Sequence, residues 1–182
     1  DSLLIFLAMD IPLGAKLIDV GSGAGIPGLL LKICRPDLKV TLLDARKKRI
    51  GFLQQTVAQL KLKNIECIWA RAEEVGHNSN YREGYSIAVA RGLARLNLLV
   101  EYCLPLVKIE GFLVAYKGPE GDQELKTAQK AIALMGGGET EIWQKILPGG
   151  EEKRKLIIIK KERHTPENYP RRAGIPAKRP IE

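Results

Sequence analysis

A glycine-rich turn near the start of the chain has the residue types of a nucleoside-cofactor site. The segment KLIDVGSGAGIPG, residues 16–28, reads as an apolar strand that ends near Asp19 and passes through glycines into a helix. Glycine lets the backbone turn sharply and approach a ligand with no side chain in the way. About twenty residues further on, VTLLD ends in Asp44, an acid placed to accept hydrogen bonds from ribose hydroxyls. The pattern predicts a nucleoside-containing cofactor across the carboxyl edge of a parallel sheet.

Two classes of cofactor are compatible with this turn. A G-x-G-x-x-G match at residues 23–28 indicates NAD or FAD, but it begins after Gly21, the first glycine of the turn. The turn also matches apolar-apolar-Asp-apolar-Gly-x-Gly-x-Gly, the first motif of S-adenosylmethionine (SAM) methyltransferases. Asp19 suits the ammonium and sulfonium groups of SAM, whereas an anionic pyrophosphate requires an unopposed helix N-terminus. We therefore favour SAM over NAD, and a structural turn with no ligand is the third interpretation.

The charge of the chain indicates a polyanionic partner. The net charge is +8, which is high for an enzyme that acts on small metabolites. Four consecutive cations, Arg46, Lys47, Lys48 and Arg49, follow Asp44 directly, where the next helix is expected to begin. Cations at a helix N-terminus oppose the helix dipole, so phosphate binding explains them better than helix stability does. The alternative is a solvated charge run.

Length and composition predict a single cytoplasmic domain. The 182 residues suffice for one well-buried core, and no apolar run reaches the length of a membrane span. We expect a monomer with no membrane partner. Cys34, Cys67 and Cys103 are far apart and form no C-x-x-C pair, which predicts a reducing compartment, buried apolar roles and no metal site.

The apolar periodicity alternates between strand and helix. Expected strands are 16–20, 39–43, 65–70, 86–90 and 111–117, and expected helices are 26–34, 47–60, 96–107 and 122–135. Two further strands, 139–146 and 155–161, are expected to form an antiparallel hairpin through a Pro-Gly turn at 147–150. The pattern predicts an α/β fold, a Rossmann-like SAM-dependent methyltransferase fold whose mostly parallel seven-stranded sheet ends in that hairpin.

A series of motifs along the chain carries a family resemblance. They are DSL (1–3), DVGSGAGIPG (19–28), LLDARKKRIGFL (42–53), RAEE (71–74), ARGLARL (90–96), LPLVK (104–108), AYKG (115–118) and YPRRAGIPAKRP (169–180). In this order they resemble the RsmG family, also called GidB, of bacterial 16S ribosomal RNA methyltransferases. The resemblance spans essentially the whole chain. It implies methyl transfer from SAM to N7 of one guanine in the 530 loop of the RNA of the small ribosomal subunit.

The implied reaction requires no general base. Guanine N7 has a free lone pair at neutral pH, so its attack on the sulfonium methyl needs in-line positioning only. The sequence lacks the Asn-Pro-Pro-Tyr and Asp-Pro-Pro-Tyr motifs of amine methylases, and it lacks the Pro-Cys and Thr-Cys motifs used against pyrimidine rings. Cys103 is therefore expected in the core. His77 and His164 have no acid beside them that would make either a convincing base, and we expect both on the surface.

The motifs and the resemblance together assign the site residues. Expected cofactor contacts are Gly21, Gly23, Gly25, Ile26, Asp44, Ala72, Glu73 and Arg91. Glu73 can accept from the exocyclic amine of adenine. Arg91 ends the fourth strand, where substrate and cofactor meet, so it is also a candidate for positioning the RNA; the alternative is a structural ion pair. Expected RNA contacts are Arg46, Lys47, Lys48, Arg49, Arg71, Arg95, Lys117, Arg171 and Arg172.

Both ends of the chain differ from the central domain. In the RsmG family a helical segment precedes DSL, so residues 1–12 are expected to be the remnant of that segment in a shortened chain. Residues 164–182 form a basic, proline-rich tail beyond a methyltransferase domain at 1–163. Because proline limits the entropy lost on docking, we expect an irregular arm that contacts RNA. In the alternative, the tail packs on the domain with Tyr169 and Ile175 as anchors.

Two other functions are compatible with parts of the sequence. The chain could be a non-catalytic RNA-binding module on a methyltransferase fold, although the intact glycine turn and Asp44 argue against loss of activity. It could also be an NAD-dependent oxidoreductase, which the positive charge and the lack of proton-transfer residues disfavour. Calorimetry with SAM, S-adenosylhomocysteine and NADH separates these functions.

Overall fold

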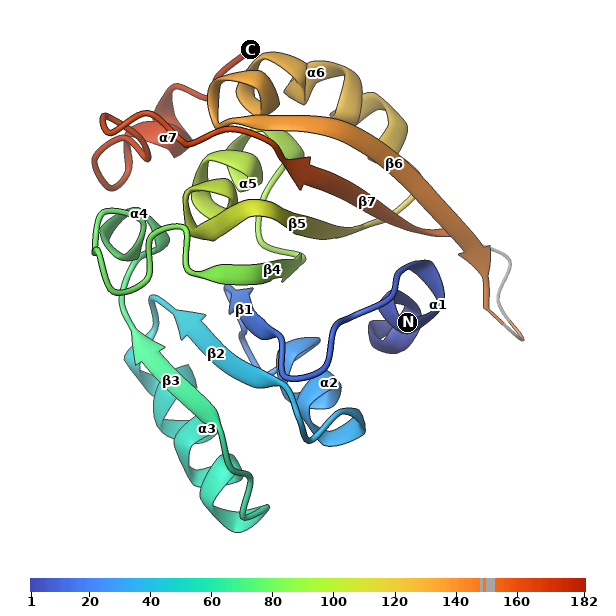
Figure 1. Cartoon of the computed structure of the whole chain (residues 1–182), viewed down its shortest axis with the longest axis vertical. Helices are drawn as coiled ribbons and strands as arrows, with labels where there is room; N and C mark the ends of the chain where they lie inside the picture. Colours follow the sequence, from blue (N-terminus) through green and yellow to red (C-terminus); the bar gives the residue numbers. More distant parts are fainter. Residues whose placement is uncertain (148, 150–152) are drawn as a thin grey trace.

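A twisted sheet of seven strands forms the centre of the molecule (Figure 1). The strands lie in the order β3-β2-β1-β4-β5-β7-β6; β1 to β5 run parallel, and β7 runs antiparallel to both of its neighbours. The expected Rossmann-like sheet with a C-terminal hairpin is thereby confirmed. The computed structural model describes residues 1–147, 149 and 153–182, so part of the turn expected at 147–150 lies outside the described residues.

Strands and helices alternate, because each connection between parallel strands must cross over the sheet. The strands are β1 (Lys16–Val20), β2 (Lys39–Asp44), β3 (Ile65–Trp69), β4 (Tyr85–Arg91), β5 (Val107–Lys117), β6 (Gly137–Ile146) and β7 (Lys153–Lys161). The helices are α1 (Ile5–Ala8), α2 (Gly28–Cys34), α3 (Lys47–Gln59), α4 (Ala72–Val75), α5 (Leu96–Cys103), α6 (Gly121–Leu134) and α7 (Ile175–Lys178). Short 3₁₀ turns at Ser2–Leu4 and Leu104–Leu106 precede α1 and β5.

Proline accounts for two differences from the expected boundaries. The helix expected over 96–107 ends at Cys103, because Pro105 lacks the N–H that would continue it. The chain therefore enters β5 at Val107 rather than at residue 111. The helix expected from residue 26 begins at Gly28, because a residue directly before proline, here Ile26, is disfavoured in the helical region. The short helices α4 and α7 were not expected.

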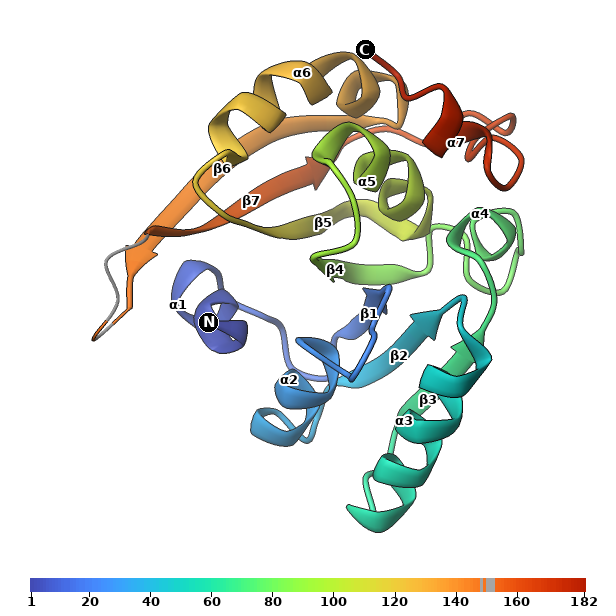
Figure 2. The ribbon, with the colours of Figure 1, turned by 180° about the vertical axis from the view of Figure 1, so that it is seen from behind.

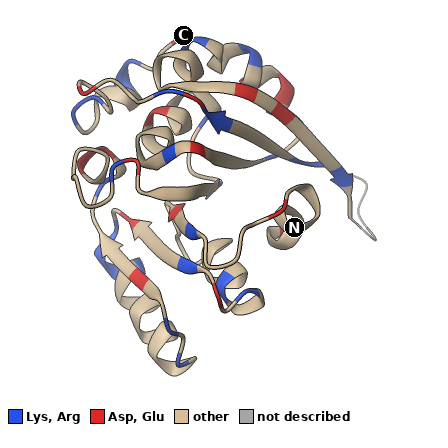
Figure 3. Cartoon of the chain, viewed as in Figure 1, with Lys and Arg blue, Asp and Glu red and all other residues tan. Residues whose placement is uncertain are grey.

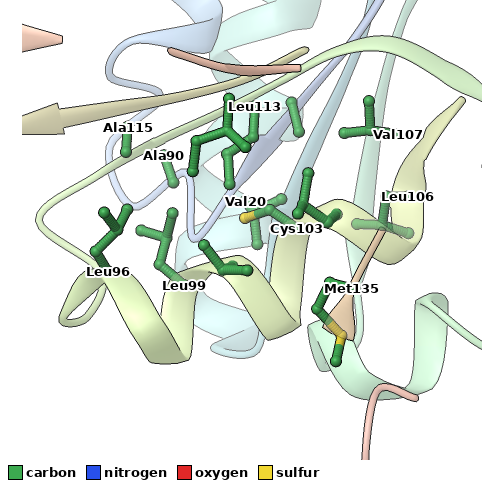
Figure 4. Close-up of a cluster of buried hydrophobic side chains, with 14 of the residues drawn as sticks. Val20, Ala90, Leu96, Leu99, Cys103, Leu106, Val107, Leu113, Ala115 and Met135 are labelled. Carbon is green, nitrogen blue, oxygen red and sulfur yellow. The ribbon is translucent and has the colours of Figure 1, made fainter. Parts of the chain in front are cut away.

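The central strands are apolar on both faces because helices cover both faces. In β4, Ile87 and Val89 belong to the core under α1, α2 and α3, whereas Ala88 and Ala90 belong to the core under α5 and α6. In Figure 2, α5 and α6 lie next to each other near β5, whereas α2 and α3 lie near β2. Figure 4 shows the second core, in which Cys103 of α5 lies among side chains of the sheet. The buried apolar role expected for the cysteines is confirmed for Cys103, which is fully buried, and is wrong for Cys34, which is exposed; Cys67 is half-buried.

The C-terminal tail is irregular outside α7, as expected, but it packs on the domain, as the alternative proposed, instead of extending as an arm beyond residue 163. The Arg82 guanidinium donates hydrogen bonds to the carbonyl oxygens of Thr165 and Tyr169, at 2.7 and 2.8 Å. Side chains of the domain thus satisfy backbone groups that helices or strands would otherwise satisfy. Tyr169 packs against the core, as the alternative proposed, but Ile175 is 40% exposed and does not act as an anchor. Pro170 is buried instead.

Candidate functional site

A cavity of about 160 Å³ opens where the carboxyl ends of β1, β2 and β3 meet. Gly21, Asp44, Ala72 and Glu73 line it, so four of the expected cofactor contacts converge at one place. Ligands of open α/β sheets bind at this edge, outside the carboxyl ends of the strands. Larger hollows of about 540 and 380 Å³ lie at the opposite edge, and none of the expected site residues lines them.

Asp44 is fixed in a position to receive hydroxyl groups. Its Oδ1 accepts from the backbone N of Arg46 at 2.8 Å, and its Oδ2 accepts from the backbone N of Gly23 at 3.0 Å and from Arg49 Nη1 at 3.2 Å. A carboxylate offers about four acceptor positions, so one is still open. The Arg49 side chain is 45% exposed, so it can move away and leave its acceptor position on Asp44 to a second ligand hydroxyl. The geometry fits a ribose with two neighbouring hydroxyls.

Gly21 shapes the turn beside Asp44. Its φ of +76° lies in the left-handed region, and a Cβ there would lie 2.7 Å from Leu93 Cδ1. Gly25 serves packing, because a Cβ on it would lie 2.9 Å from the Cβ of Leu29 in α2. Of the other turn residues expected to contact the cofactor, Gly23 acts through its N–H to Asp44, and Ile26 does not line the cavity.

Asp19 lies fully buried beneath the turn. Its Oδ2 accepts from the backbone N of Gly28 at 2.8 Å, whereas its Oδ1 has no hydrogen-bond partner in the described part of the chain. Burial raises the pKa of this carboxyl to about 7, against the opposing effect of the Gly28 hydrogen bond; Asp44 raises it further and Arg91 lowers it. A buried, unpartnered carboxylate oxygen favours a cationic ligand and disfavours an anionic one. The site therefore fits SAM better than a dinucleotide.

Glu73 connects the cavity to the C-terminal tail. The side chain is buried, and its Oε1 accepts from the backbone N of Gly174 at 3.1 Å. The tail thus holds the acid that we expect at the edge of adenine. Sequence reasoning missed this contact, because it joins residues 101 positions apart.

Two side chains of the cavity were also missed. Leu93 follows β4 and packs over Gly21. Its position directly after a predicted strand could have indicated that it lines the cavity. Tyr102 reaches the cavity from α5, and no local pattern marks it. Burial raises the pKa of Tyr102 to about 12, with smaller effects from nearby acids, so its hydroxyl stays protonated at neutral pH.

Arg91 forms the structural ion pair that was its alternative role. Its Nη1 lies 3.2 Å from Asp1 Oδ2 and donates to Ser2 Oγ at 3.0 Å. It does not line the cavity, although its charge influences Asp19. Through this pair, Arg91 ties the end of β4 to the N-terminal residues.

The expected RNA contacts divide into exposed and structural residues. Lys117 and Arg171 are corrections: Lys117 Nζ donates to the carbonyl of Ala94 at 2.7 Å and to Glu124 at 2.6 Å, and Arg171 pairs with the buried Glu101. Both side chains are largely buried, 9% exposed for Lys117 and 25% for Arg171, and their charges are paired within the fold. The exposed set is Arg46, Lys47, Lys48, Arg49, Arg71, Arg95 and Arg172.

The basic cluster at residues 46–49 borders the cavity. Figure 3 shows Lys and Arg at the beginning of α3, beside the ends of β2 and β3. The backbone N of Arg46 and the guanidinium of Arg49 hold Asp44 in place. The residue expected to bind the cofactor and the cations expected to bind RNA phosphates are therefore in direct contact.

Both histidines lie on the surface and contact the tail or its base. His77 Nε2 lies 2.6 Å from the Pro170 carbonyl oxygen, and His164 Nδ1 lies 2.5 Å from Glu83 Oε2. Neither lines the cavity, in agreement with the surface role expected for them, but the expectation that no acid lies beside them is wrong for His164, which contacts Glu83. Among residues 1–147, 149 and 153–182, no group of His, Cys, Asp or Glu is arranged to hold a metal ion, and none of the helices is long and apolar enough to span a membrane.

Comparison with known sequences identifies close relatives. The sequence model of the family described as GidB, rRNA small subunit methyltransferase G, matches residues 1–156. Ribosomal RNA small subunit methyltransferase G of Moorella thermoacetica is 57% identical over 182 residues, which cover 100% of this chain and 76% of the relative. The protein of that name from Desulforamulus reducens is 45% identical over 181 residues, covering 100% of this chain and 75% of the relative.

Comparison with solved structures supports the fold. A predicted O-methyltransferase from Agrobacterium tumefaciens superimposes with a TM-score of 0.71 at 19% identity, covering 91% of this chain and 83% of the other. An rRNA methylase from Streptococcus thermophilus gives a TM-score of 0.59 at 19% identity, covering 82% and 87%. At this identity the similarity establishes the methyltransferase fold alone.

Proposed function

The chain belongs to the rRNA small subunit methyltransferase G family, and on that premise we propose that it methylates N7 of a guanine in the 530 loop of 16S ribosomal RNA, with SAM as the methyl donor. The observation that carries the proposal is the convergence of Gly21, Asp44 and Glu73 on one cavity, directly beside an exposed basic turn. We further propose that the protein acts in the cytoplasm as a monomer.

The residues around the cavity would hold the two ends of the cofactor differently. Asp44 would accept from the ribose hydroxyls, and Glu73, held by the Gly174 N–H, would accept from the adenine amine. Asp19 would favour the ammonium of the amino-acid end. When bound, SAM supplies a methyl group on a cationic sulfur.

The protein's part in the reaction is alignment. Guanine N7 attacks through a lone pair that carries no proton, so no side chain has to remove one. This arrangement agrees with a cavity lined by a neutral tyrosine, Tyr102, and by no histidine.

The RNA would approach over the exposed cations near the cavity. We propose contacts from the basic turn of α3, from two arginines beside the strand ends and from one arginine of the tail: Arg46, Lys47, Lys48, Arg49, Arg71, Arg95 and Arg172. Phosphate contacts of this kind supply affinity that falls with added salt.

The test is methyl transfer from labelled SAM to 16S RNA, offered as naked RNA, as the 30S subunit and as assembly intermediates. We expect label at N7 of one guanine with at least one of these substrates, and little label with the Asp44→Ala variant. SAM binding without transfer to any of them would favour the non-catalytic RNA-binding module. Binding of NADH in place of SAM would favour the oxidoreductase.

A further inference from the structure

An exposed indole lies beside the cofactor cavity. Trp69 is the last residue of β3 and is 57% exposed. It pairs in register with Asp44 of β2, and neighbouring strands lie about 4.8 Å apart. The indole Nε1 donates to the Ala45 carbonyl oxygen at 3.1 Å, so one edge of the ring is fixed while the ring stays accessible.

The ring forms one wall of a hollow that continues the cavity. Ala45, Ala70 and Arg71 line both spaces, and Trp69 with Glu74 completes the hollow, whose volume is about 320 Å³. Two cations lie beside it: Lys47 Nζ lies over one face of the indole ring, 5.0 Å from its centre and outside the lining of the hollow, and the exposed Arg71 is part of that lining. Glu74 is held in place because its Oε2 accepts from the backbone N of Arg71 at 3.2 Å.

We propose that the Trp69 hollow binds one unpaired nucleobase of the RNA, stacked on the indole, beside the end of the cavity where we expect the adenine of the cofactor. An unpaired base offers a flat face to an aromatic ring and phosphates to nearby cations. The Glu74 carboxylate can accept from an amino group on the edge of the base. The inference rests on the proposed function, because it takes RNA as the substrate.

The surroundings distinguish Trp69 from an ordinary exposed apolar residue. Single exposed apolar side chains are common and need no explanation. Here the ring is fixed, cations flank it, and its hollow continues into the cofactor cavity. A second exposed aromatic, Phe52, also lies beside cations of the basic turn. It is 52% exposed and lines a hollow of about 300 Å³ with Lys48 and Arg49. The surface fits single-stranded RNA, which combines bases and phosphates.

Tryptophan fluorescence provides the test. The chain has two tryptophans, and Trp143→Phe leaves Trp69 as the reporter. The probes are a ten-nucleotide single-stranded RNA, the same sequence as a duplex, inorganic polyphosphate, and SAM. We expect the single strand to quench Trp69, and the duplex, polyphosphate and SAM to leave its emission nearly unchanged. Quenching by SAM alone, or equal quenching by polyphosphate, would overturn the proposal.

Two substitutions distinguish stacking on an aromatic face from contact with any large apolar side chain. Trp69→Leu keeps an apolar side chain without an aromatic face, and we expect single-strand affinity to fall by roughly 5- to 150-fold, the range for one stacked base. Trp69→Phe should retain most of the affinity. The salt dependence and SAM affinity should match wild type in both. If Trp69→Leu binds the single strand as tightly as Trp69→Phe, stacking is refuted.

The outcome is distinguishable from failure of the proposed function. In methyl transfer, Trp69→Leu should raise the KM for RNA and leave kcat and the KM for SAM nearly unchanged. Normal RNA KM in an active variant would refute the stacking site alone. Absence of transfer by the wild-type protein would refute the proposed function, whereas the fluorescence titration would still report on base stacking.

Discussion

Replacing Arg171 with methionine tests whether one buried ion pair holds the tail on the domain. Glu101 of α5 is 1% exposed at its side chain, and the Arg171 side chain is 25% exposed. Arg171 donates from Nε to Oε1 at 2.9 Å and from Nη2 to Oε2 at 2.6 Å, and its backbone N donates to Oε1 at 2.9 Å. In Arg171→Met, the Glu101 carboxylate stays buried and keeps only the backbone donor.

The expected loss of stability follows from this geometry. Removing one partner of a buried ion pair costs about 3–5 kcal/mol, because the other charge is left unpaired. Here the backbone donor stays, and water can reach the partly exposed side of the pair. We therefore expect the free energy of unfolding to fall by about 2–4 kcal/mol. For a chain of this length that corresponds to a lower melting temperature by roughly 5–15 °C.

Urea unfolding followed by circular dichroism measures the loss. Arg172→Met removes the neighbouring exposed arginine and should change the free energy of unfolding by less than about 0.5 kcal/mol. Combining Arg171→Met with Glu101→Leu removes both charges and should recover much of the loss. A loss below about 1 kcal/mol in Arg171→Met, or one equal to that of Arg172→Met, would refute the reasoning.

Four further predictions concern the cavity, the RNA surface and the tail. Asp44→Ala should weaken SAM binding in calorimetry by about 1–3 kcal/mol, and unchanged affinity in the folded variant would remove Asp44 from the site. Replacing Lys47 and Lys48 with glutamine should weaken RNA binding and lower the slope of log affinity against log salt concentration by up to about two, with SAM affinity unchanged. The control replaces Lys61 and Lys63, two exposed lysines just beyond the C-terminal end of α3, with glutamine. An equal effect from the control would contradict a local RNA surface at the basic turn. Burial raises the pKa of Asp19 to about 7, so the folded state binds this proton more tightly than the unfolded state. The stability of the free protein should therefore fall as the pH rises from about 4 to about 7, SAM affinity should rise through about pH 7, and Asp19→Asn should flatten both profiles in melting and calorimetry. Deleting residues 164–182 should lower both the melting temperature and SAM affinity, because the acid at the adenine edge loses its donor; unchanged values would show that the tail is dispensable.

The alternation of strands and helices and the position of the glycine turn could be predicted from the sequence. Strand and helix periodicities are local properties, and the central parallel strands are apolar on both faces because both faces are covered. The turn at Gly21 is also local, since its φ of +76° lies in the left-handed region that glycine adopts without strain. Asp44 could be placed because parallel strands all end at one edge of the sheet, and an acid at a strand end faces that edge.

The roles of the charged residues were decided by the tertiary structure. Arg171 and Arg172 are adjacent and chemically identical, yet one pairs with Glu101, 70 residues away, and the other is exposed. Lys117 likewise pairs with Glu124 inside the fold, although it stands where an RNA contact was expected. A basic, proline-rich tail has the same composition whether it extends into solvent or docks on a domain. Only the fold determines which carboxylates are buried and within reach, because the cost of burying a charge depends on its partner and not on its neighbours in the sequence.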